Sequence, residues 1–392
     1  MNDCYIVYAK RTPIGKINGT LSHIRVDDLM KIVLEDFKEN CDFNLSSIDD
    51  VLIGCTNQAG EDNRNLARMS LLLAGFPEEV PGSTFNRLCG SSLDTVMGAF
   101  ARISSGLADC IIAGGAESMS RAPYVLSKAD KTLARNQKLI DSTFGWRFEN
   151  PKMKNIFPLL NMGQTAEEIQ KKYKISREDQ DNFALNSHLK ALKAIENGDF
   201  NNEIIPINDI SVDECIRKDS SLEKLSKLKA VFSKEGTITA GNSYPMNDGA
   251  SAVCVVSEAF MKKHNLIPIA KITGATVKGV HPTFMGLGPI VATKELCKKF
   301  NYSIEDFDII ELNEAFAVQA LACIQDLNLD ISKVNPKGGA IAIGHPLGCS
   351  GTRILTSLIH SMKSNPNLKH GLATMCIGVG QGIAISLENY SK

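Results

Sequence analysis

Two glycine-rich turns near the end of the chain read NPKGGAIAIGHPLGCSG over residues 335–351 and CIGVGQG over residues 376–382. Glycine adopts backbone conformations that other residues avoid, and it lets a ligand approach the main chain closely. The first turn carries His345, an acid/base group, and the second begins with Cys376, a thiol. Together the two groups indicate acyl chemistry on sulfur.

Strands and a helix are predicted around these turns. A strand over 307–312 precedes the His345 turn, a helix with apolar spacing over 354–362 follows it, and residues 372–377 form the next strand. Residues 383–387 also read as a strand, whereas a dinucleotide-binding fingerprint needs a helix after its glycines. The second turn is therefore predicted to be a hairpin that presents backbone amides.

A second thiol lies in the first half of the chain, within FNRLCGSSLD over residues 85–94. Apolar residues recur at helical spacing from Leu93 to Ile103, which predicts a buried helix that begins at Ser91 or Ser92. Cys89 would then lie at a helix N-terminus, where unpaired amides and the macrodipole favour a thiolate. This makes Cys89 the candidate nucleophile.

The first half repeats the order of elements seen in the second. A strand over 51–54 precedes the Cys89 turn, its helix and a strand over 110–115, so we interpret the chain as a weak internal duplication of an α/β unit. Each half should carry a mixed sheet with helices on its faces. Residues 119–247 are richer in Lys, Asn, Asp and Glu and are expected to be an insertion over one face that carries binding specificity. The alternative is a solvated structural appendage.

A plain structural interpretation competes with the catalytic one for every cysteine and histidine. Cysteine is among the most buried residue types, and most cysteines of a reduced protein simply pack in the core. The neighbouring glycines and the helix start favour catalysis for Cys89 and Cys376. The cysteines in apolar runs and the histidines other than His345 are interpreted as structural.

Bulk properties narrow the class of protein. A chain of 392 residues is long enough for two core-bearing domains, and its net charge of -1 gives no attraction to nucleic acid or membrane. The eleven cysteines are an odd number with no C-x-x-C pair, which argues against a disulfide framework and a zinc ribbon, and no ligand spacing suggests another metal. We see no signal peptide or membrane span and expect a reducing, cytoplasmic location.

Five ordered motifs carry a family resemblance along essentially the whole chain. They are NRLCGSS at 86–92, GGAESMS at 114–120, NEAF at 313–316, GHPLG at 344–348 and CIGVGQG at 376–382. On these motifs the chain resembles the thiolases, the acetyl-CoA acyltransferases. The resemblance implies a duplicated five-layer αβαβα fold of class α/β and a homodimer or homotetramer, with coenzyme A as a substrate and no cofactor.

The resemblance also implies a division of the chain. Residues 1–118 with about 248–268 would form the N-terminal thiolase half, 119–247 an inserted loop domain that binds coenzyme A, and 269–392 the C-terminal half.

Catalytic roles follow from the same resemblance. Cys89 would attack the 3-oxo carbon of a 3-oxoacyl-CoA after His345 takes its proton, giving an acyl-enzyme. His345 and a water held by Asn313 would stabilise the enolate of acetyl-CoA. Cys376 would protonate that enolate and then deprotonate the incoming coenzyme A. Backbone amides of Cys89 and Gly378 would form an oxyanion hole.

Substrate-binding residues are carried over in the same way. The resemblance points to Arg217 near the adenine or phosphates of coenzyme A, and to Leu228, Phe232 and Ala240 lining its groove. Tyr244 and Met162 are also expected to bind the substrate or coenzyme A. The chain departs from biosynthetic acetoacetyl-CoA thiolases in two places. It has Asn161 before Met162 where many of them have His, and Tyr244-Pro245 where they have a Ser-Gly pair.

The segments SRAPY at 120–124 and GWRF at 145–148 resemble the degradative branch that cleaves 3-oxoadipyl-CoA and longer 3-oxoacyl-CoAs. We therefore favour degradative thiolysis, with fatty-acid β-oxidation as the expected context. The alternatives are an acetoacetyl-CoA-specific biosynthetic thiolase, a non-catalytic protein that binds acyl-CoA or lipid, and a decarboxylating synthase. The presence of Cys376 argues against the last, because decarboxylating enzymes of this fold use two histidines, or His and Asn, instead.

Overall fold

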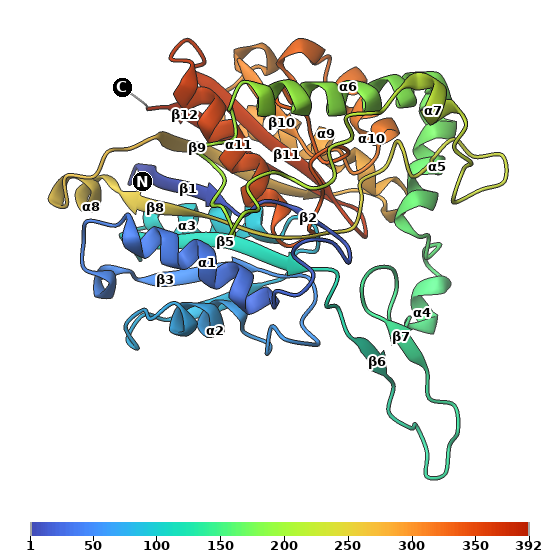
Figure 1. The fold of residues 1–392 in the computed structure, drawn as a ribbon, viewed down its shortest axis with the longest axis horizontal. Coiled ribbons are helices and arrows are strands. Elements are labelled where there is room, and N and C mark those ends of the chain that lie inside the picture. Colours follow the sequence, from blue (N-terminus) through green and yellow to red (C-terminus); the bar gives the residue numbers. More distant parts are fainter. Residues whose placement is uncertain (1, 391–392) are drawn as a thin grey trace.

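The computed structural model describes residues 2–390 and is built around one mixed sheet (Figure 1). Ten strands form this sheet in the order β10-β11-β12-β9-β1-β8-β5-β3-β4, with β2 paired to β8 beside that path. The strands are β1 (Cys4–Arg11), β2 (Gly15–Lys16), β3 (Asp50–Gly54), β4 (Gly82–Phe85), β5 (Cys110–Ser118), β8 (Asn247–Ser257), β9 (Ala270–Gly279), β10 (Ile309–Leu312), β11 (His370–Ile377) and β12 (Gln381–Asn389).

The strand order confirms the internal duplication. β3 pairs in parallel with β5, β5 antiparallel with β8, and β8 antiparallel with β1. In the second half β10 pairs in parallel with β11, β11 antiparallel with β12, and β12 antiparallel with β9. The two half-sheets are also hydrogen-bonded to each other, because β1 and β9 occupy equivalent edges and pair over Cys4–Ile6 and Ala270–Ile272. This pairing protects two strand edges that would otherwise be open.

Helices complete five layers. α3 (Ser91–Ser104) and α11 (Ser350–Ser364) pack against each other and contact strands of both half-sheets, so they form the central layer. α1 (Val26–Glu39) and α2 (Leu66–Leu73) cover the outer face of the first half-sheet, and α9 (Gly288–Phe300) and α10 (Ala317–Asp326) lie on the outer side of the second half. The predicted αβαβα architecture is confirmed, and α3 begins at Ser91 as its apolar spacing predicted.

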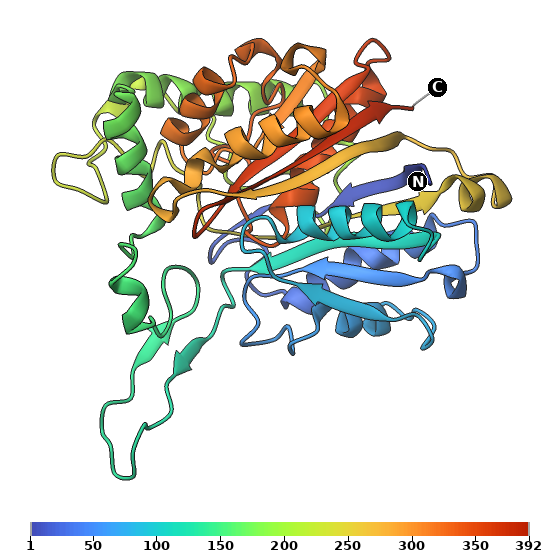
Figure 2. The same ribbon diagram turned by 180° about the vertical axis from the view of Figure 1, so that it is seen from behind.

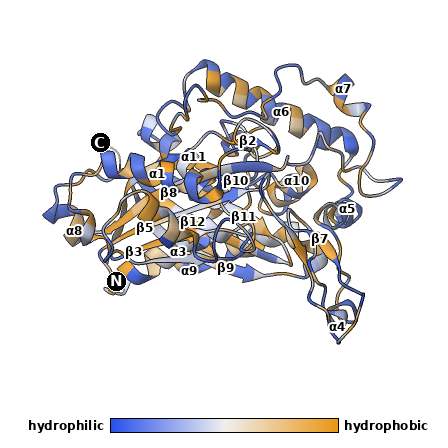
Figure 3. Ribbon diagram, turned by 60° about the horizontal axis from the view of Figure 1, so that its bottom comes forward, coloured by the Kyte–Doolittle hydropathy of each residue, from blue (hydrophilic) through white to orange (hydrophobic). Residues whose placement is uncertain are grey.

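The five layers explain why the strands are apolar on both faces. In β8, Val253 and Val255 point into the central core, whereas Cys254 and Val256 point into the outer core beneath α1. Such strands read as continuous hydrophobic runs because neither face meets water. Figure 3 shows the same contrast, with orange, hydrophobic colour along the inner strands, whereas blue, hydrophilic residues alternate with orange ones along the outer helix α6 (Arg177–Glu196).

The inserted segment leaves the body after β5. Its first part is a hairpin of β6 (Tyr124–Leu126) and β7 (Leu139–Asp141) that projects away from the sheet, followed by α4 (Pro151–Lys154) (Figures 1 and 2). α5 (Met162–Tyr173) and α6 then pack on α10, and α7 (Leu222–Ser226) packs on α6. The chain returns through β8 and α8 (Glu258–Lys263). No helix within residues 2–390 has the length and apolar character that a bilayer span requires.

Candidate active site

The predicted hairpin turn lies between β11 and β12, whose pairing ends at Ile377 and Gln381. Val379 has a φ of 64° and Gly380 a φ of 84°, so two successive residues adopt the left-handed conformation. A β-branched residue rarely does so, and such outliers gather at functional sites. Leu88, directly before Cys89, has a φ of 47°. The backbone is therefore strained on both sides of the place where the two turns meet.

Cys89 lies just before α3, whose N-cap is Gly90. The backbone N–H groups of Gly378 and of Cys89 itself donate to the Cys89 sulfur, and both lower the pKa of the thiol. Burial acts in the opposite direction and is the larger effect, so the pKa of Cys89 is raised to about 11. The expectation that the helix start would favour a thiolate is therefore wrong for the unliganded protein. Loss of solvation outweighs the helix terminus, and the sulfur needs a base to become a nucleophile.

A cavity of about 260 Å³ opens onto Cys89. The residues that line it come from the two turns and from the inserted segment: Thr56, Leu88, Cys89, Ser142, Thr143, Phe144, Gly145, Trp146, Arg147, Asn161, Met162, Tyr244, Leu347, Gly378 and Val379. Four of the residues predicted for the site are thus brought together around one space, namely Cys89, Gly378, Met162 and Tyr244.

His345 is held at the start of α11 with its imidazole oriented by Ser350. The His345 Nδ1 and Ser350 Oγ are 2.5 Å apart, and the Ser350 hydroxyl donates to the carbonyl of Pro346 at 2.8 Å. Because the serine hydrogen is used there, Nδ1 carries the ring proton and Nε2 keeps the lone pair of the base. Burial, with the positive charge of Arg353, lowers the pKa of His345 to about 3. The ring is a neutral imidazole at pH 7.

The backbone of His345 is fixed from the opposite strand. Its N–H donates to Asn247 Oδ1 at 2.8 Å, and Asn247 Nδ2 donates to the carbonyl of Gly15 at 2.9 Å. Gly344 has a φ of 123°, and a Cβ there would lie 2.7 Å from the Asn247 side chain. The glycine before His345 is therefore required both by its conformation and by the close approach of Asn247.

Tyr244 brings the aromatic wall of the cavity against His345. The two rings meet edge to face with centroids 4.7 Å apart, and Phe316 packs on the other side of Tyr244 at 5.9 Å. The Tyr244 N–H donates to the carbonyl of Ala315 at 3.1 Å, which ties this loop to the 313–316 motif. Burial is the largest cause of the raised pKa of Tyr244, and the charges of Cys89 and Cys376 raise it further. Tyr244 is thus a common neighbour of both thiols and the imidazole.

Cys376 and Asn313 do not belong to the lining of this cavity and lie at the ends of adjacent parallel strands. The Asn313 N–H donates to the carbonyl of Thr374 at 3.0 Å, and its side chain is 1% exposed, with Oδ1 and Nδ2 bonded to no protein group. Burial, followed by the charge of Cys89, raises the pKa of Cys376 well above its ordinary value. Cys376 is therefore a protonated thiol within electrostatic range of Cys89.

Glu117, at the end of β5, connects the two halves of the site and was not singled out from the sequence. Its carboxylate accepts from the N–H and hydroxyl of Thr56, the N–H of Asn57 and the N–H of Gly348, at 2.6 to 3.1 Å. Gly348 belongs to the His345 turn, so Glu117 fixes that turn to the first half-sheet. Ser350 and Asn247 were missed for the same reason, because each acts through a contact that no local pattern marks.

The residues predicted to bind coenzyme A divide between two places. Arg217 and Ala240 line a second cavity of about 250 Å³, separate from the one that holds Cys89. Phe232 packs edge to face on Phe316 with centroids 6.5 Å apart. Leu228 and Phe232 belong to the lining of neither cavity. Their roles, like the catalytic ones, stay predictions.

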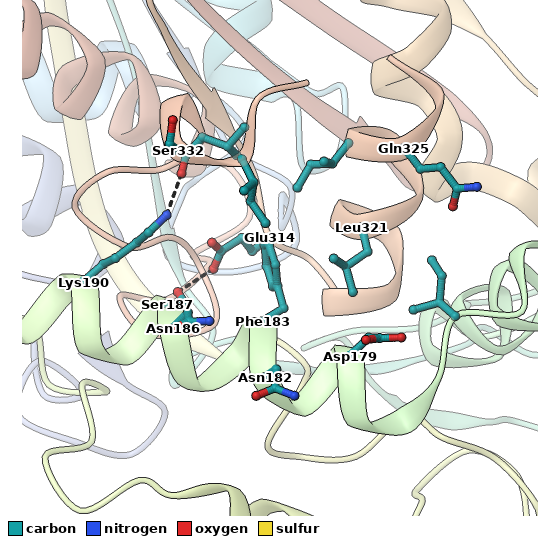
Figure 4. Close-up of a pocket in the computed structure, with 14 residues that line it drawn as sticks. Asp179, Asn182, Phe183, Asn186, Ser187, Lys190, Glu314, Leu321, Gln325 and Ser332 are labelled. Carbon is teal, nitrogen blue, oxygen red and sulfur yellow. Dashed lines mark hydrogen bonds between the residues drawn. The ribbon is translucent and has the colours of Figure 1, made fainter. Parts of the chain in front are cut away.

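A larger cavity of about 570 Å³ lies between α6 and α10, away from the thiols (Figure 4). Glu314 points into it and accepts a hydrogen bond from Ser187 at 2.7 Å and another from Asn335 at 2.8 Å. Size alone would favour this cavity as the site, but it holds neither a thiol nor His345. Glu314 anchors the 313–316 motif to α6, while Asn313 beside it directly follows β10, the strand that pairs with the β11 strand of Cys376.

Known proteins agree with this geometry. The family model described as "Thiolase, N-terminal domain" matches residues 4–259, and "Thiolase, C-terminal domain" matches residues 266–389. A beta-ketoadipyl-CoA thiolase of Pseudomonas aeruginosa is 48% identical over 397 residues, covering 98% of this chain and 99% of that protein. A 3-oxoadipyl-CoA/3-oxo-5,6-dehydrosuberyl-CoA thiolase of Escherichia coli K12 is 48% identical over 400 residues, covering 99% of this chain and 100% of that protein.

A solved structure is similar over the same length. Human mitochondrial 3-ketoacyl-CoA thiolase in complex with CoA superposes with a TM-score of 0.92 at 39% identity, covering 99% of this chain and 98% of that one. Both family models, full-length relatives and a full-length fold match therefore agree with the thiol and imidazole geometry. The chain belongs to the thiolase family of acyltransferases.

Proposed function

We propose that the protein catalyses the coenzyme A-dependent cleavage of 3-oxoadipyl-CoA to acetyl-CoA and succinyl-CoA through an acyl-enzyme on Cys89. The observation that carries the proposal is the meeting of Cys89, the Gly378 amide, His345 and Cys376 around Tyr244. The names of the relatives that are 48% identical favour this substrate over a generic 3-oxoacyl chain.

The first half-reaction breaks the bond between C2 and C3 of the substrate. His345 Nε2 takes the Cys89 proton as the sulfur attacks C3, and the amides of Cys89 and Gly378 stabilise the oxyanion. As the C2–C3 bond breaks, its electron pair forms the enolate of acetyl-CoA. The Cys376 thiol gives its proton to C2, so acetyl-CoA leaves while a succinyl thioester stays on Cys89. The buried Oδ1 and Nδ2 atoms of Asn313 form no hydrogen bond with the protein. This supports the expected role of Asn313 in holding a water that donates to the enolate oxygen.

The second half-reaction restores every group. The Cys376 thiolate takes the proton of incoming coenzyme A, whose sulfur attacks the succinyl carbonyl carbon. The Cys89 sulfur leaves and recovers its proton from His345, so no net proton is gained or lost. The raised pKa of Cys376 suits both of its steps, because the thiol holds its proton until a carbanion forms and the thiolate is then a strong base.

Coenzyme A is a substrate in this proposal, and no cofactor takes part. The cavity that contains Arg217 and Ala240 is the proposed place for its nucleotide end, while Met162 and Tyr244 line the space beside Cys89 for the reacting end. The similarity to a thiolase solved with CoA supports the assignment of this ligand. Leu228 and Phe232 remain proposed groove residues.

The biological setting remains a proposal as well. All eleven cysteines are free, which agrees with a reducing compartment such as the cytoplasm and with a mechanism that needs two free thiols. The homodimer or homotetramer, the three segments of the chain and the link to fatty-acid β-oxidation stay predictions. Biosynthetic condensation of acetyl-CoA and a non-catalytic binding role are the alternatives that the experiment below separates.

The proposal is tested by following coenzyme A-dependent loss of the 3-oxoacyl thioester for acetoacetyl-CoA, 3-oxohexanoyl-CoA and 3-oxoadipyl-CoA. We expect 3-oxoadipyl-CoA to have the highest kcat/KM and Cys89→Ala to abolish cleavage of all three. Cys41→Ala, which removes a free thiol far from the cavity, is the matched control and should retain full activity. A preference for acetoacetyl-CoA would favour the biosynthetic alternative, and absence of cleavage by folded protein would overturn the enzyme assignment.

A further inference from the structure

We infer that Arg147 forms a carboxylate subsite in the cavity that holds Cys89, where it binds the terminal carboxylate of a dicarboxylic 3-oxoacyl chain. The inference rests on the proposed function and names the residue that would give it its substrate preference. It concerns recognition of the end of the acyl chain that does not react.

Among residues 2–390, Arg147 supplies the only charge on the lining of this cavity. Fourteen other residues line the space, and none of them carries a charge at pH 7. Cys89 and Tyr244 can ionise, but their raised pKa values keep both protonated. Arg147 is half-buried and has no ion pair or hydrogen bond to any side chain or carbonyl within residues 2–390. Arg121, near the start of the same inserted segment, is paired, because it donates to Glu61 at 2.7 Å. An arginine that is half-buried, unpaired and part of a cavity lining is available for an anionic ligand.

The polar neighbours of Arg147 are already committed to protein partners. The Ser142 hydroxyl donates to the carbonyl of Pro123 at 2.5 Å, and the Thr143 hydroxyl donates to Asp141 at 2.5 Å. Trp146 donates from its ring N–H to the carbonyl of Leu160 at 3.1 Å, which fixes the segment just before Arg147 against the chain that leads into α5. The guanidinium is thus a free, charged donor of this wall, on a backbone that is held in place.

The chemistry of guanidinium selects the ligand. Its planar donors match the two oxygens of a carboxylate, and such charge-assisted pairs are stronger in a partly dry cavity than in water. When Cys89 attacks C3, the carbons beyond C3 extend away from the thioester, so a dicarboxylic chain presents its carboxylate to the remaining walls of the cavity. A chain that ends in a methyl group would leave the Arg147 charge half-buried and unpaired, which costs binding energy.

A phosphate of coenzyme A is the competing ligand for this guanidinium. A second cavity, which contains Arg217 and Lys16, already offers cations for phosphate. The two ligands also predict different kinetics. Loss of a carboxylate contact affects only substrates that carry a carboxylate, whereas loss of a phosphate contact raises the KM of coenzyme A and weakens every acyl-CoA equally.

The test compares 3-oxoadipyl-CoA with 3-oxohexanoyl-CoA, which has the same six acyl carbons and ends in a methyl group. Steady-state thiolysis is measured for wild type, Arg147→Met and Arg147→Lys. Arg135→Met, which removes an exposed arginine without a protein partner among residues 2–390 from the tip of the β6–β7 hairpin that precedes Arg147, is the matched control. Thermal melting of each variant shows that it is folded.

We expect the ratio of kcat/KM for 3-oxoadipyl-CoA over 3-oxohexanoyl-CoA to fall about 10- to 100-fold in Arg147→Met, mainly through KM for the dicarboxylic substrate, as for loss of a charged hydrogen bond. Arg147→Lys should recover part of the ratio, and Arg135→Met should keep it. An unchanged ratio in Arg147→Met, equal losses on both substrates, or a wild type without preference for 3-oxoadipyl-CoA would each overturn the subsite. Wild type that cleaves neither substrate would overturn the proposed function as well, which separates the two failures.

Discussion

Replacing Ser350 by alanine should impair catalysis without touching a reacting group. Ser350 is fully buried and His345 is 1% exposed, and their contact of 2.5 Å is what places the ring proton on Nδ1. Alanine would leave that N–H without an acceptor in a place that water does not reach. A buried donor left unpaired costs about 1 to 3 kcal/mol, which the ring can avoid only by turning or by moving its proton to Nε2. Either response removes the base that Cys89 needs.

The expected loss in kcat/KM is about 5- to 150-fold, because each 1.36 kcal/mol corresponds to a factor of ten. The assay is thiolysis of 3-oxoadipyl-CoA, with the loss expected in kcat rather than in KM. Single-turnover acylation of Cys89 is measured on the same samples, since a purely structural role for Ser350 would lower the melting temperature without slowing acylation per folded molecule.

Ser361→Ala is the matched control for this variant. Ser361 is also buried on α11 and also donates to a backbone carbonyl, that of Ser357 at 2.8 Å, but it is remote from His345. We expect its kcat/KM to stay within about twofold of wild type, since the loss of one neutral hydrogen bond away from His345 acts on stability rather than on the base. The reasoning is refuted if Ser350→Ala also stays within that range, or if Ser361→Ala loses as much activity.

Three further predictions follow from the pKa shifts and contacts. The rate at which iodoacetamide alkylates Cys89 should rise about tenfold per pH unit from pH 7 to 9. The reason is that a thiol with a pKa of about 11 is a thiolate in roughly one molecule in 10,000 at pH 7. A rate that reaches a plateau near neutral pH would contradict this prediction. Tyr244→Phe should keep kcat/KM for thiolysis within about threefold of wild type, whereas Tyr244→Ala should lose about tenfold. The reason is that the ring contact with His345 contributes to catalysis and the hydroxyl does not. Equal losses in the two variants would contradict this prediction. Glu203→Gln should lower the free energy of unfolding by about 3 kcal/mol at pH 7, because it breaks a fully buried ion pair with Arg11. Burial favours the neutral form of Glu203, but the charges of Arg11 and Lys337 outweigh burial and hold the pKa of Glu203 at about 2. The stabilisation by the ion pair is therefore present above about pH 4.5 and is lost as the pH falls toward 2. Urea unfolding at pH 7 and pH 3 should show that the difference in unfolding free energy between wild type and Glu203→Gln shrinks at pH 3, and a constant difference would contradict the ion pair.

Local patterns were enough to find the elements that carry the chemistry. The apolar spacing from Leu93 to Ile103 located the start of α3, and the apolar run after Gly382 identified the hairpin that places Gly378. Glycine-rich sequence also marked the turn of His345, where Gly344 has a φ of 123°. These features depend on residues close together in the sequence, and they could be predicted for that reason.

Contacts between distant residues could not be predicted in the same way. Glu117 binds the amide of Gly348 across 231 positions of sequence, and Asn247 holds His345 across 98. The pKa of Cys89 was misjudged because the helix start is local whereas the burial that outweighs it comes from walls contributed along the chain. The joining of the half-sheets through β1 and β9 is likewise a product of the folded arrangement.

The central claim is that Cys89 carries the acyl group, and intact-protein mass spectrometry tests it most directly. The protein is mixed with 3-oxoadipyl-CoA without free coenzyme A, quenched in acid, and digested to locate the modification. The account predicts a gain of one succinyl group on the peptide that contains Cys89, lost on addition of coenzyme A and absent from Cys89→Ala. A protein that cleaves the substrate without any mass gain, or a gain that persists in Cys89→Ala, would contradict it.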